Sequence, residues 1–225
     1  SILTGDEQRL RALIEGKPGS DLIEVVHAPE VIGMNESPVE AVRRKKDSSL
    51  AAAARLVREK QAVGLVSAGS TGATLAASLF VIGRIKGVER PAITTLMPTI
   101  KGVCLVADVG ANVDCRPSHL VQFAKMASAY AEHVMQIHKP KVGLLNVGEE
   151  PGKGNALVKE VYEELVQSSL NFIGNIEGRD ITKGHADVVV CDGFVGNVVL
   201  KFAEGLAGSL FEIMKEEFTS TVSGS

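Results

Sequence analysis

Aromatic side chains are scarce in this chain of 225 residues, and tryptophan is absent. Aromatic residues make up 4% of the sequence, which leaves few rings for stacking against nucleic-acid bases. An excess of charge of one sign is also lacking, because 24 Lys and Arg stand against 27 Asp and Glu, for a formal net charge of −3. This balance gives no basis for general polyanion binding. Nucleic acid is therefore not an expected partner.

Cysteine and long apolar runs are also rare. The three cysteines, Cys104, Cys115 and Cys191, have no CxxC spacing, and their number is odd. Two of them lie in or beside apolar runs, where cysteine is usually a small buried hydrophobe. We expect neither a signal peptide nor an apolar stretch long enough to span a bilayer. The sequence thus predicts a reduced, cytoplasmic setting.

Glycine is plentiful, with 23 residues, and apolar runs alternate with amphipathic ones. Strands are expected at residues 22–26, 63–66, 93–96, 103–107, 142–145, 172–173 and 186–191, and residues 1–6 are expected to be the tail of a strand that runs into a turn and a helix. Helices are expected at residues 6–15, 73–85, 117–135, 156–166 and 198–218, and two more begin at Ser37 and at Asp47. This alternation predicts an α/β fold with a largely parallel sheet. Without a low-complexity linker, residues 1–225 are expected to form one domain or two intimate subdomains.

Four glycine-containing turns follow expected strands and precede expected helices. They lie at residues 67–72, 108–112, 146–149 and 192–197. In parallel α/β sheets, ligands bind outside the carboxyl ends of the strands, where helix N-termini favour anions. The four turns together predict one anion-binding cleft.

The first turn has the composition of a phosphate cradle, with small hydroxyl residues between glycines. Its residues are Ser67, Gly69, Ser70, Thr71 and Gly72, with Ala68 between them. It matches neither the Walker A motif nor GxGxxG. The alternative is a plain helix start with Ser70 or Thr71 as N-cap.

The loop at residues 146–155 mixes Asn, Glu, Lys and three glycines ahead of a helix. Lys153 would neutralise a phosphate, and Asn146 or Asn155 would donate to a carbonyl oxygen. The alternative is a solvated loop whose Asn155 caps the helix.

Further polar pairs occupy two of these turns and another glycine-bounded turn that is expected at residues 174–178. These are Asp108 with Asn112, Asn175 with Glu177, and Asp192 with Asn197. Each alone is a turn former or a cap, whereas on the strands of one sheet they would form a site. No compact spacing supports a metal at Asp108, Glu177 and Asp192. The five histidines are scattered and expected at surfaces or helix ends, so any reaction would depend on positioning and charge stabilisation.

Two other segments allow two interpretations each. Arg43, Arg44, Lys45 and Lys46 form a basic run at an expected helix end, which is either a solvated face or a docking site for an acidic macromolecule. The last helix carries an apolar stripe of Phe202, Leu206, Leu210 and Ile213. Core packing or a dimer seam is favoured there over a membrane surface, because the neighbouring polar residues are acidic.

Five segments, taken in order, resemble one known family. They are residues 41–49 (AVRRKKDSS), 67–73 (SAGSTGA), 108–114 (DVGANVD), 143–150 (GLLNVGEE) with 153–155 (KGN), and 192–197 (DGFVGN). The chain resembles the PlsX family of bacterial acyl-ACP:phosphate acyltransferases over nearly its whole length. It departs from the family pattern by having Ser70 where Asn is more common and by a short junction at residues 100–102. Family segments upstream of Ser1 and beyond Ser225 are also expected to be missing.

The resemblance implies transfer of a fatty acyl group from acyl carrier protein to inorganic phosphate, giving acyl phosphate for phospholipid synthesis. It implies a three-layer α/β/α fold like that of isocitrate and isopropylmalate dehydrogenases and of phosphotransacetylases. It also implies a homodimer, no cofactor and no metal. Peripheral membrane association and contact with a membrane glycerol-3-phosphate acyltransferase are implied as well.

The site residues that we carry over from the turns fall into three groups. The catalytic group is Lys153, Asn197, Asn146 and Asp192. The phosphate- and substrate-binding group is Ser67, Gly69, Ser70, Thr71, Gly72, Asp108, Asn112, Glu149, Asn155, Gly193 and Gly196. The carrier-docking group is Arg43, Arg44, Lys45 and Lys46.

Three other functions stay open at this point. One is a phosphotransacetylase-like enzyme that uses acyl-CoA, and another is a non-catalytic phosphate- or acyl-binding module on the same fold. The third is a decarboxylating dehydrogenase, which is disfavoured because the sequence has no clustered Asp metal site and no nucleotide fingerprint.

Overall fold

The structure, a computed structural model, describes the backbone of residues 1–222 and the side chains of residues 1–219. The chain divides into two compact units, Ser1–Gly87 and Val88–Ser225. Each unit is described by itself below. Whether the two form one intimate domain stays a prediction.

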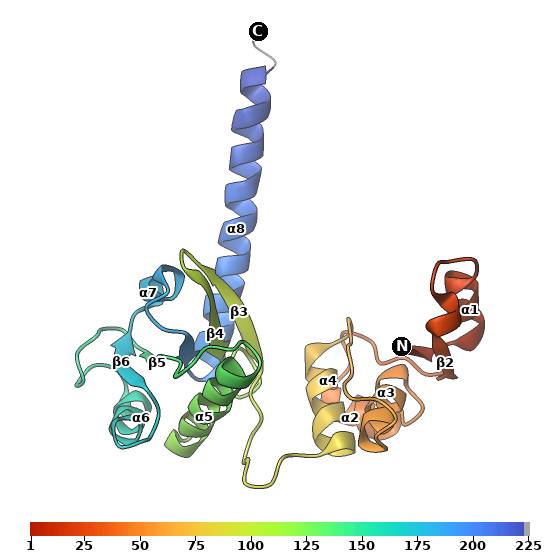
Figure 1. Cartoon of the computed structure of the whole chain (residues 1–225), viewed down its shortest axis with the longest axis horizontal. Coiled ribbons are helices and arrows are strands. Elements are labelled where there is room, and N and C mark those ends of the chain that lie inside the picture. The colour runs from red at the N-terminus through yellow and green to blue at the C-terminus, as the bar shows by residue number, and fades with distance from the viewer. Residues whose placement is uncertain (223–225) are drawn as a thin grey trace. The chain divides into compact units, whose positions relative to one another are not determined.

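Unit 1, coloured red to yellow in Figure 1, contains a small parallel sheet and a cluster of helices. Its elements are β1 (Ile2–Gly5), α1 (Glu7–Ile14), η1 (Ser20–Leu22), β2 (Glu24–His27), α2 (Pro38–Arg44), α3 (Ser49–Arg58), α4 (Thr71–Ala77) and η2 (Ser78–Ile82). Local signals set the helix starts: Asp6 caps α1, Ser48 caps α3, and Pro38 occupies the first turn of α2. Alanines of α3 and α4 pack with Val42 to form the unit's core.

The strand expected at residues 63–66 does not form, and this prediction was wrong. Val63 and Val66 are 109% and 101% exposed. A strand needs a neighbour to pair with its backbone N–H and C=O groups. β1 pairs with β2 alone, so within the described residues the apolar segment finds no such neighbour.

Unit 2 is built on a five-stranded sheet with the order β3-β4-β7-β5-β6. The strands are β3 (Thr94–Thr99), β4 (Gly102–Ala107), β5 (Val142–Leu145), β6 (Phe172–Ile176) and β7 (Val188–Val190). β3 is antiparallel to β4, and every other neighbouring pair is parallel. The carboxyl ends of β4, β7, β5 and β6 therefore meet at one edge.

Helices cover both faces of this sheet (Figure 1). Leu105, Leu144 and Val188 point to the face covered by α5 (Pro117–His133) and α6 (Ala156–Val166). Cys104 and Val189 point to the opposite face, which is covered by α7 (Gly178–Lys183) and the start of α8 (Gly193–Val222). Side chains that alternate along β4 and β7 thus enter two separate cores. The predicted three-layer α/β/α fold is confirmed.

Two element boundaries differ from prediction. The turn expected at residues 174–178 is mostly strand β6, followed directly by α7, a helix that we did not predict. A capping box starts α7, since Glu177 and Asp180 accept each other's backbone N–H, and Gly184 ends it in the left-handed region. Six residues are too few to show a 3.6-residue apolar period.

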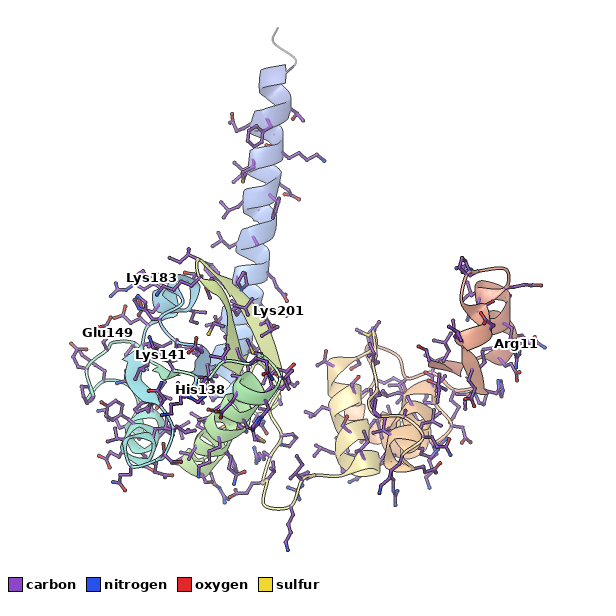
Figure 2. The ribbon with its side chains drawn as sticks, viewed as in Figure 1. Arg11, His138, Lys141, Glu149, Lys183 and Lys201 are labelled. Atoms are coloured by element: carbon purple, nitrogen blue, oxygen red, sulfur yellow. The ribbon has the colours of Figure 1, made fainter. Side chains whose placement is uncertain are left out.

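Helix α8 begins at Gly193 rather than at Val198 and is mostly exposed. Beyond Lys201 it extends away from the sheet (Figure 2). Phe202, Leu206 and Leu210 are 69%, 47% and 50% exposed, so the core packing considered for this stripe is not observed.

The segment Gly193–Thr219 is long and apolar enough to cross a membrane, contrary to our prediction that no such stretch exists. Length and composition alone do not separate a spanning helix from one that packs against protein.

Candidate functional site

Three of the four predicted turns come together at the carboxyl edge of the unit 2 sheet. Residues 108–112 follow β4, residues 192–197 follow β7 and residues 146–155 follow β5. Since β4, β7 and β5 are adjacent, their turns are neighbours. The fourth turn, Ser67–Gly72, belongs to unit 1.

Asp108 organises the first of these turns. Its side chain is fully buried. Oδ1 accepts the N–H groups of Ile93 and Ala111 at 3.0 and 3.1 Å, and Oδ2 accepts the backbone N–H and side-chain Nδ2 of Asn112 at 2.7 and 2.8 Å. Asn112 Nδ2 also donates to the Pro91 carbonyl at 2.8 Å. Asp108 and Asn112 therefore hold the backbone in place, and neither carboxylate oxygen of Asp108 lacks a partner.

Two glycines let helix α8 approach this turn closely. A Cβ atom at Gly196 would lie 1.9 Å from the Asp108 carbonyl oxygen, and one at Gly193 would lie 2.7 Å from the Asn112 carbonyl oxygen. The Gly193 N–H donates to that same Asn112 oxygen at 2.7 Å. The β4 turn and the first turn of α8 are thus joined backbone to backbone.

Asp192 and Asn197 flank these glycines. Asp192 Oδ1 accepts the Val195 N–H at 2.9 Å, which makes Asp192 the N-terminal cap of α8. The Asn197 side chain lies against Gly110, where an added Cβ would be 3.4 Å from Asn197 Oδ1. Asp192 thus has a structural role, and the Asn197 side chain forms no hydrogen bond within the described residues.

Asn146 closes the loop that follows β5. Its Nδ2 donates to the Lys153 carbonyl at 3.1 Å, and its Oδ1 accepts the Val147 N–H at 2.8 Å. Asn155 Oδ1 accepts the Val158 N–H at 2.9 Å and caps α6. Lys153 and Glu149 are exposed on the loop, and Figure 2 labels Glu149 there. The loop is held at both ends while its charged side chains meet solvent.

Asn175 on β6 also forms a hydrogen bond with the loop that follows β5. It is 6% exposed, and its Nδ2 donates to the Glu150 carbonyl at 2.9 Å. Its Oδ1 is buried without a hydrogen-bond partner among the described residues. The predicted pairing of Asn175 with Glu177 is not formed: Glu177 instead caps α7 and pairs with Arg179 at 2.9 Å.

A cavity of about 350 Å³ opens between the loop after β5 and the start of α8. It is lined by Leu120, Leu144, Leu145, Asn146, Val147, Gly154, Asn155, Val158, Cys191, Asp192 and Val195. The sequence analysis identified the polar members but missed the apolar ones. Those residues belong to expected strands and helices, where an apolar side chain that lines a cavity has the same sequence pattern as one that fills a core.

The Ser67–Gly72 turn lies beside a second cavity of about 270 Å³ within unit 1. Ser67 Oγ accepts the Gly69 N–H at 3.1 Å, and Ser70 Oγ accepts the Ala73 N–H at 3.4 Å as the cap of α4. Thr71 begins the helix, and Thr4 and Ser49 complete the polar part of the cavity wall. The cap that we considered as the alternative is present, and phosphate binding at this turn stays a prediction.

Most side chains of the basic run, residues 43–46, contact other residues of unit 1. Lys45 Nζ binds Glu36 Oε1 at 2.5 Å and the Val31 carbonyl at 2.6 Å, and Arg44 binds Glu36 Oε2 at 3.1 Å. The hydrogen bond from Lys45 is the main cause that lowers the pKa of Glu36. The Arg43 guanidinium stacks over Phe80 at 5.1 Å. Lys46 is exposed and has no side-chain partner in the described part of the chain.

Burial affects the three cysteine thiols and one of the histidines. Burial raises the pKa of Cys104 to about 12 and that of Cys115 to about 11, and it also raises the pKa of Cys191. His119, expected at a surface or a helix end, lies in the first turn of α5 and is only 4% exposed, with Nε2 3.2 Å from Glu89. Within residues 1–219, no group of three or more His, Cys, Asp or Glu side chains is arranged to hold a metal.

Fold comparison comes first: this is an α/β protein whose fold is similar to that of phosphotransacetylases. The EutD phosphotransacetylase from Staphylococcus aureus matches with a TM-score of 0.66 at 22% identity, over 92% of this chain and 74% of that one. A branched-chain phosphotransacylase from Enterococcus faecalis matches with a TM-score of 0.54 at 18% identity, over 89% and 82%. At these identities the likeness concerns the fold alone.

The family follows from sequence. The chain belongs to the fatty acid synthesis protein family, whose model matches residues 1–225, as the PlsX resemblance indicated. Proteins named phosphate acyltransferase from Desulforamulus reducens and Pelotomaculum thermopropionicum are each 56% identical, over 96% and 98% of this chain. The chain spans 65% and 64% of the lengths of these two relatives.

Proposed function

We propose that this protein acts in acyl transfer from the thioester of acyl carrier protein to inorganic phosphate, with acyl phosphate as product. Membership of the fatty acid synthesis protein family, with relatives named phosphate acyltransferase at 56% identity, is the observation that carries this proposal. The loop after β5 and the turn after β7 border one cavity and support the proposal, since the helix N-termini there supply amide donors for a developing oxyanion.

The reaction needs few protein groups. A phosphate oxygen attacks the thioester carbonyl carbon, and the carbonyl oxygen gains negative charge. The carbon–sulfur bond then breaks, and the carrier thiolate leaves and takes a proton from solvent. Phosphate is largely deprotonated at neutral pH, so positioning and oxyanion stabilisation are the main requirements. No cofactor enters this scheme.

We assign the turn residues to two tasks within the proposal. Lys153 and Asn197 contact the substrates, because their side chains form no hydrogen bonds with the part of the chain that the structure describes. Asn146, Asp108 and Asp192 position the backbone through the hydrogen bonds described above. Within unit 2, Gly193, Gly196 and the exposed Glu149 are assigned as neighbours of the reacting groups, and within unit 1 the Ser67–Gly72 turn is assigned to phosphate binding.

Turnover with two donors tests the function. The chain is incubated with acyl-ACP and phosphate, and both acyl phosphate and free carrier are quantified. We expect phosphate-dependent carrier release, and loss of one oxyanion donor in Asn197→Ala should lower it roughly 100-fold. A preference for acyl-CoA would support the phosphotransacetylase-like alternative. Binding of phosphate or acyl-ACP without any turnover would support a non-catalytic module.

We further propose that the carrier protein docks on the exposed part of the basic run. Arg43→Glu combined with Lys46→Glu should raise the apparent KM for acyl-ACP and leave kcat unchanged, because acyl carrier protein is acidic. Arg9→Glu with Lys17→Glu, two exposed cations elsewhere in unit 1, is the control with the same charge change. Equal KM values in the two variants would remove the docking assignment. Lys45 is left intact because it binds Glu36.

We also propose a homodimer in which the exposed apolar stripe of α8 forms the seam. Leu206 and Leu210 are half-exposed and one helical turn apart on this stripe. Leu206→Glu with Leu210→Glu should shift the mass measured by light scattering from dimer to monomer. Ser209→Glu on the same helix is the control for added charge alone, and a monomeric parent protein would refute the proposal.

A cytoplasmic location with peripheral membrane contact completes the proposal. A single-tailed acyl phosphate would pass to a membrane acyltransferase that acylates glycerol-3-phosphate. Flotation with lipid vesicles should recover part of the protein with the lipid, and high salt should release it if charge dominates the contact. Recovery wholly in the soluble fraction under all conditions would contradict the membrane contact.

A further inference from the structure

The cavity at the edge of the unit 2 sheet is lined by apolar side chains and by a few polar ones. Leu120 of α5 and Leu144 of β5 are among the apolar ones and are fully buried. Val158 of α6 and Val195 of α8 contribute to its walls. Asn146, Asn155 and Asp192 supply its polar groups from the turns above. A ligand that fits must therefore combine an apolar segment with a polar group at one end.

Charge argues against phosphate in this cavity. Among the residues that line it, Asp192 is the one carboxylate, and Lys, Arg and His are absent from the lining. A phosphate dianion placed there would meet this carboxylate without a neighbouring cation. Burial also raises the pKa of the Cys191 thiol, so that group is neutral. An uncharged alkyl segment meets no such penalty.

We propose that this cavity binds the part of the acyl chain next to the thioester, with the carbonyl group at the end of the cavity that is lined by the start of α8. The assignment rests on the proposed function and adds a substrate subsite to it. A volume of about 350 Å³ lies at the lower end of the range for small-ligand pockets, so it encloses part of a long chain. The remaining methylene groups lie outside it.

Direct binding tests the subsite without requiring turnover. The probes are straight-chain S-methyl thioesters of increasing length, which carry the thioester and the alkyl chain but neither charge nor carrier protein. Calorimetric titration of the full chain should show affinity rising about fourfold for each added methylene until the cavity is full. Beyond that length the affinity should stay constant.

Filling the cavity should shorten the chain that it accepts. Val158 is half-buried, and Val158→Phe places a larger side chain in the wall. We expect the affinity plateau to move to shorter thioesters and long-chain binding to weaken at least tenfold. Val166→Phe is the matched control, because Val166 lies on the same helix, is 58% exposed and does not line the cavity. Val195→Phe repeats the test from the opposite helix, in case Val158→Phe fails to fold.

The results separate this subsite from the proposed function. Chain-length-dependent binding that Val158→Phe shortens and Val166→Phe does not would support the subsite, even if no acyl transfer is detected. Transfer to phosphate with binding that ignores both substitutions would leave the function standing and overturn the subsite. Binding of inorganic phosphate that Val158→Phe abolishes would also overturn it, since the anion would then occupy the cavity.

Discussion

Both carboxylate oxygens of Asp108 accept hydrogen bonds from backbone N–H groups, and one accepts the Asn112 amide as well. In the sequence, an acidic residue between a strand and a glycine suggests a ligand contact. In the structure it determines where the neighbouring backbone groups point. Asp192 and Asn155 likewise cap helices. At the scale of single residues, much of the candidate site is therefore the framework that aims helix N-termini.

The contact at Gly196 gives a test of this framework. Gly196→Ala should lower the free energy of unfolding by about 3 kcal/mol, because its Cβ would overlap the Asp108 carbonyl oxygen. Gly208→Ala on the same helix has open space around its Cβ and should raise stability by about 0.5 to 1 kcal/mol. Urea unfolding of both variants measures the difference. Equal effects would show that the close approach is absent in solution.

Cysteine reactivity gives a test that depends on pH. Burial raises the pKa of Cys115 to about 11, so at pH 9 the folded protein holds it mainly as the unreactive thiol. In the unfolded chain, with a pKa of about 8.5, most of it is thiolate at that pH. Iodoacetamide should therefore modify Cys115 on the order of 50-fold more slowly in the folded protein. The difference should shrink as the pH rises towards 11, and mass spectrometry of the labelled peptide measures it.

At the scale of elements, periodic apolar patterns predicted helices α5 and α6 and the strands of the unit 2 sheet, because each buries a defined face. The strand predicted at residues 63–66 does not form, because strand formation depends on a neighbouring strand as well as on the apolar residues of the segment itself. Helix α7 was not predicted, although Glu177, Asp180 and Gly184 mark its ends clearly. The helix between these ends is too short to show an apolar period. The polar residues of the site could be predicted from the glycine-containing turns, whereas the apolar residues that line the cavity could not.

Neighbouring residues of the basic run at the end of α2 have different roles. Lys45→Met should cost about 1 kcal/mol in unfolding free energy, since it removes the contacts to Glu36 and to the Val31 carbonyl. Lys46→Met should change stability by less than about 0.5 kcal/mol, because Lys46 is exposed. Thermal and urea unfolding compare the two. If both substitutions were neutral, the Lys45–Glu36 pair would not be formed in solution.

At the scale of the whole molecule, the chain consists of two units, and the boundary between them in the sequence falls at Gly87. Each has its own buried cluster, with Val42 and Ala54 in unit 1 and Phe123 and Leu144 in unit 2. The residues at 83–93 that join them form neither helix nor strand, and Ile85 is 78% exposed. A connection of this kind is open to proteases.

Limited proteolysis tests this division. Brief treatment with trypsin should cut first after Lys86 and give two fragments that resist further digestion, since the cores on either side are intact. Mass spectrometry identifies the cleavage point. Lys86→Gln should slow the formation of both fragments. Early cleavage after Lys159 inside α6 would instead show that unit 2 is not independently compact.

The joint between Gly196 and the Asp108 carbonyl also sets the mechanics of α8. A helix of 30 residues is about 45 Å long. The helix is held near one end by this close contact, so any tilt of the helix is a rotation about the candidate site. A tilt of about 5° about that site displaces the far end by roughly 4 Å. Whatever holds the far end of α8 therefore fixes the orientation of its first turn, and a load applied there is transmitted to the backbone groups around Asp108.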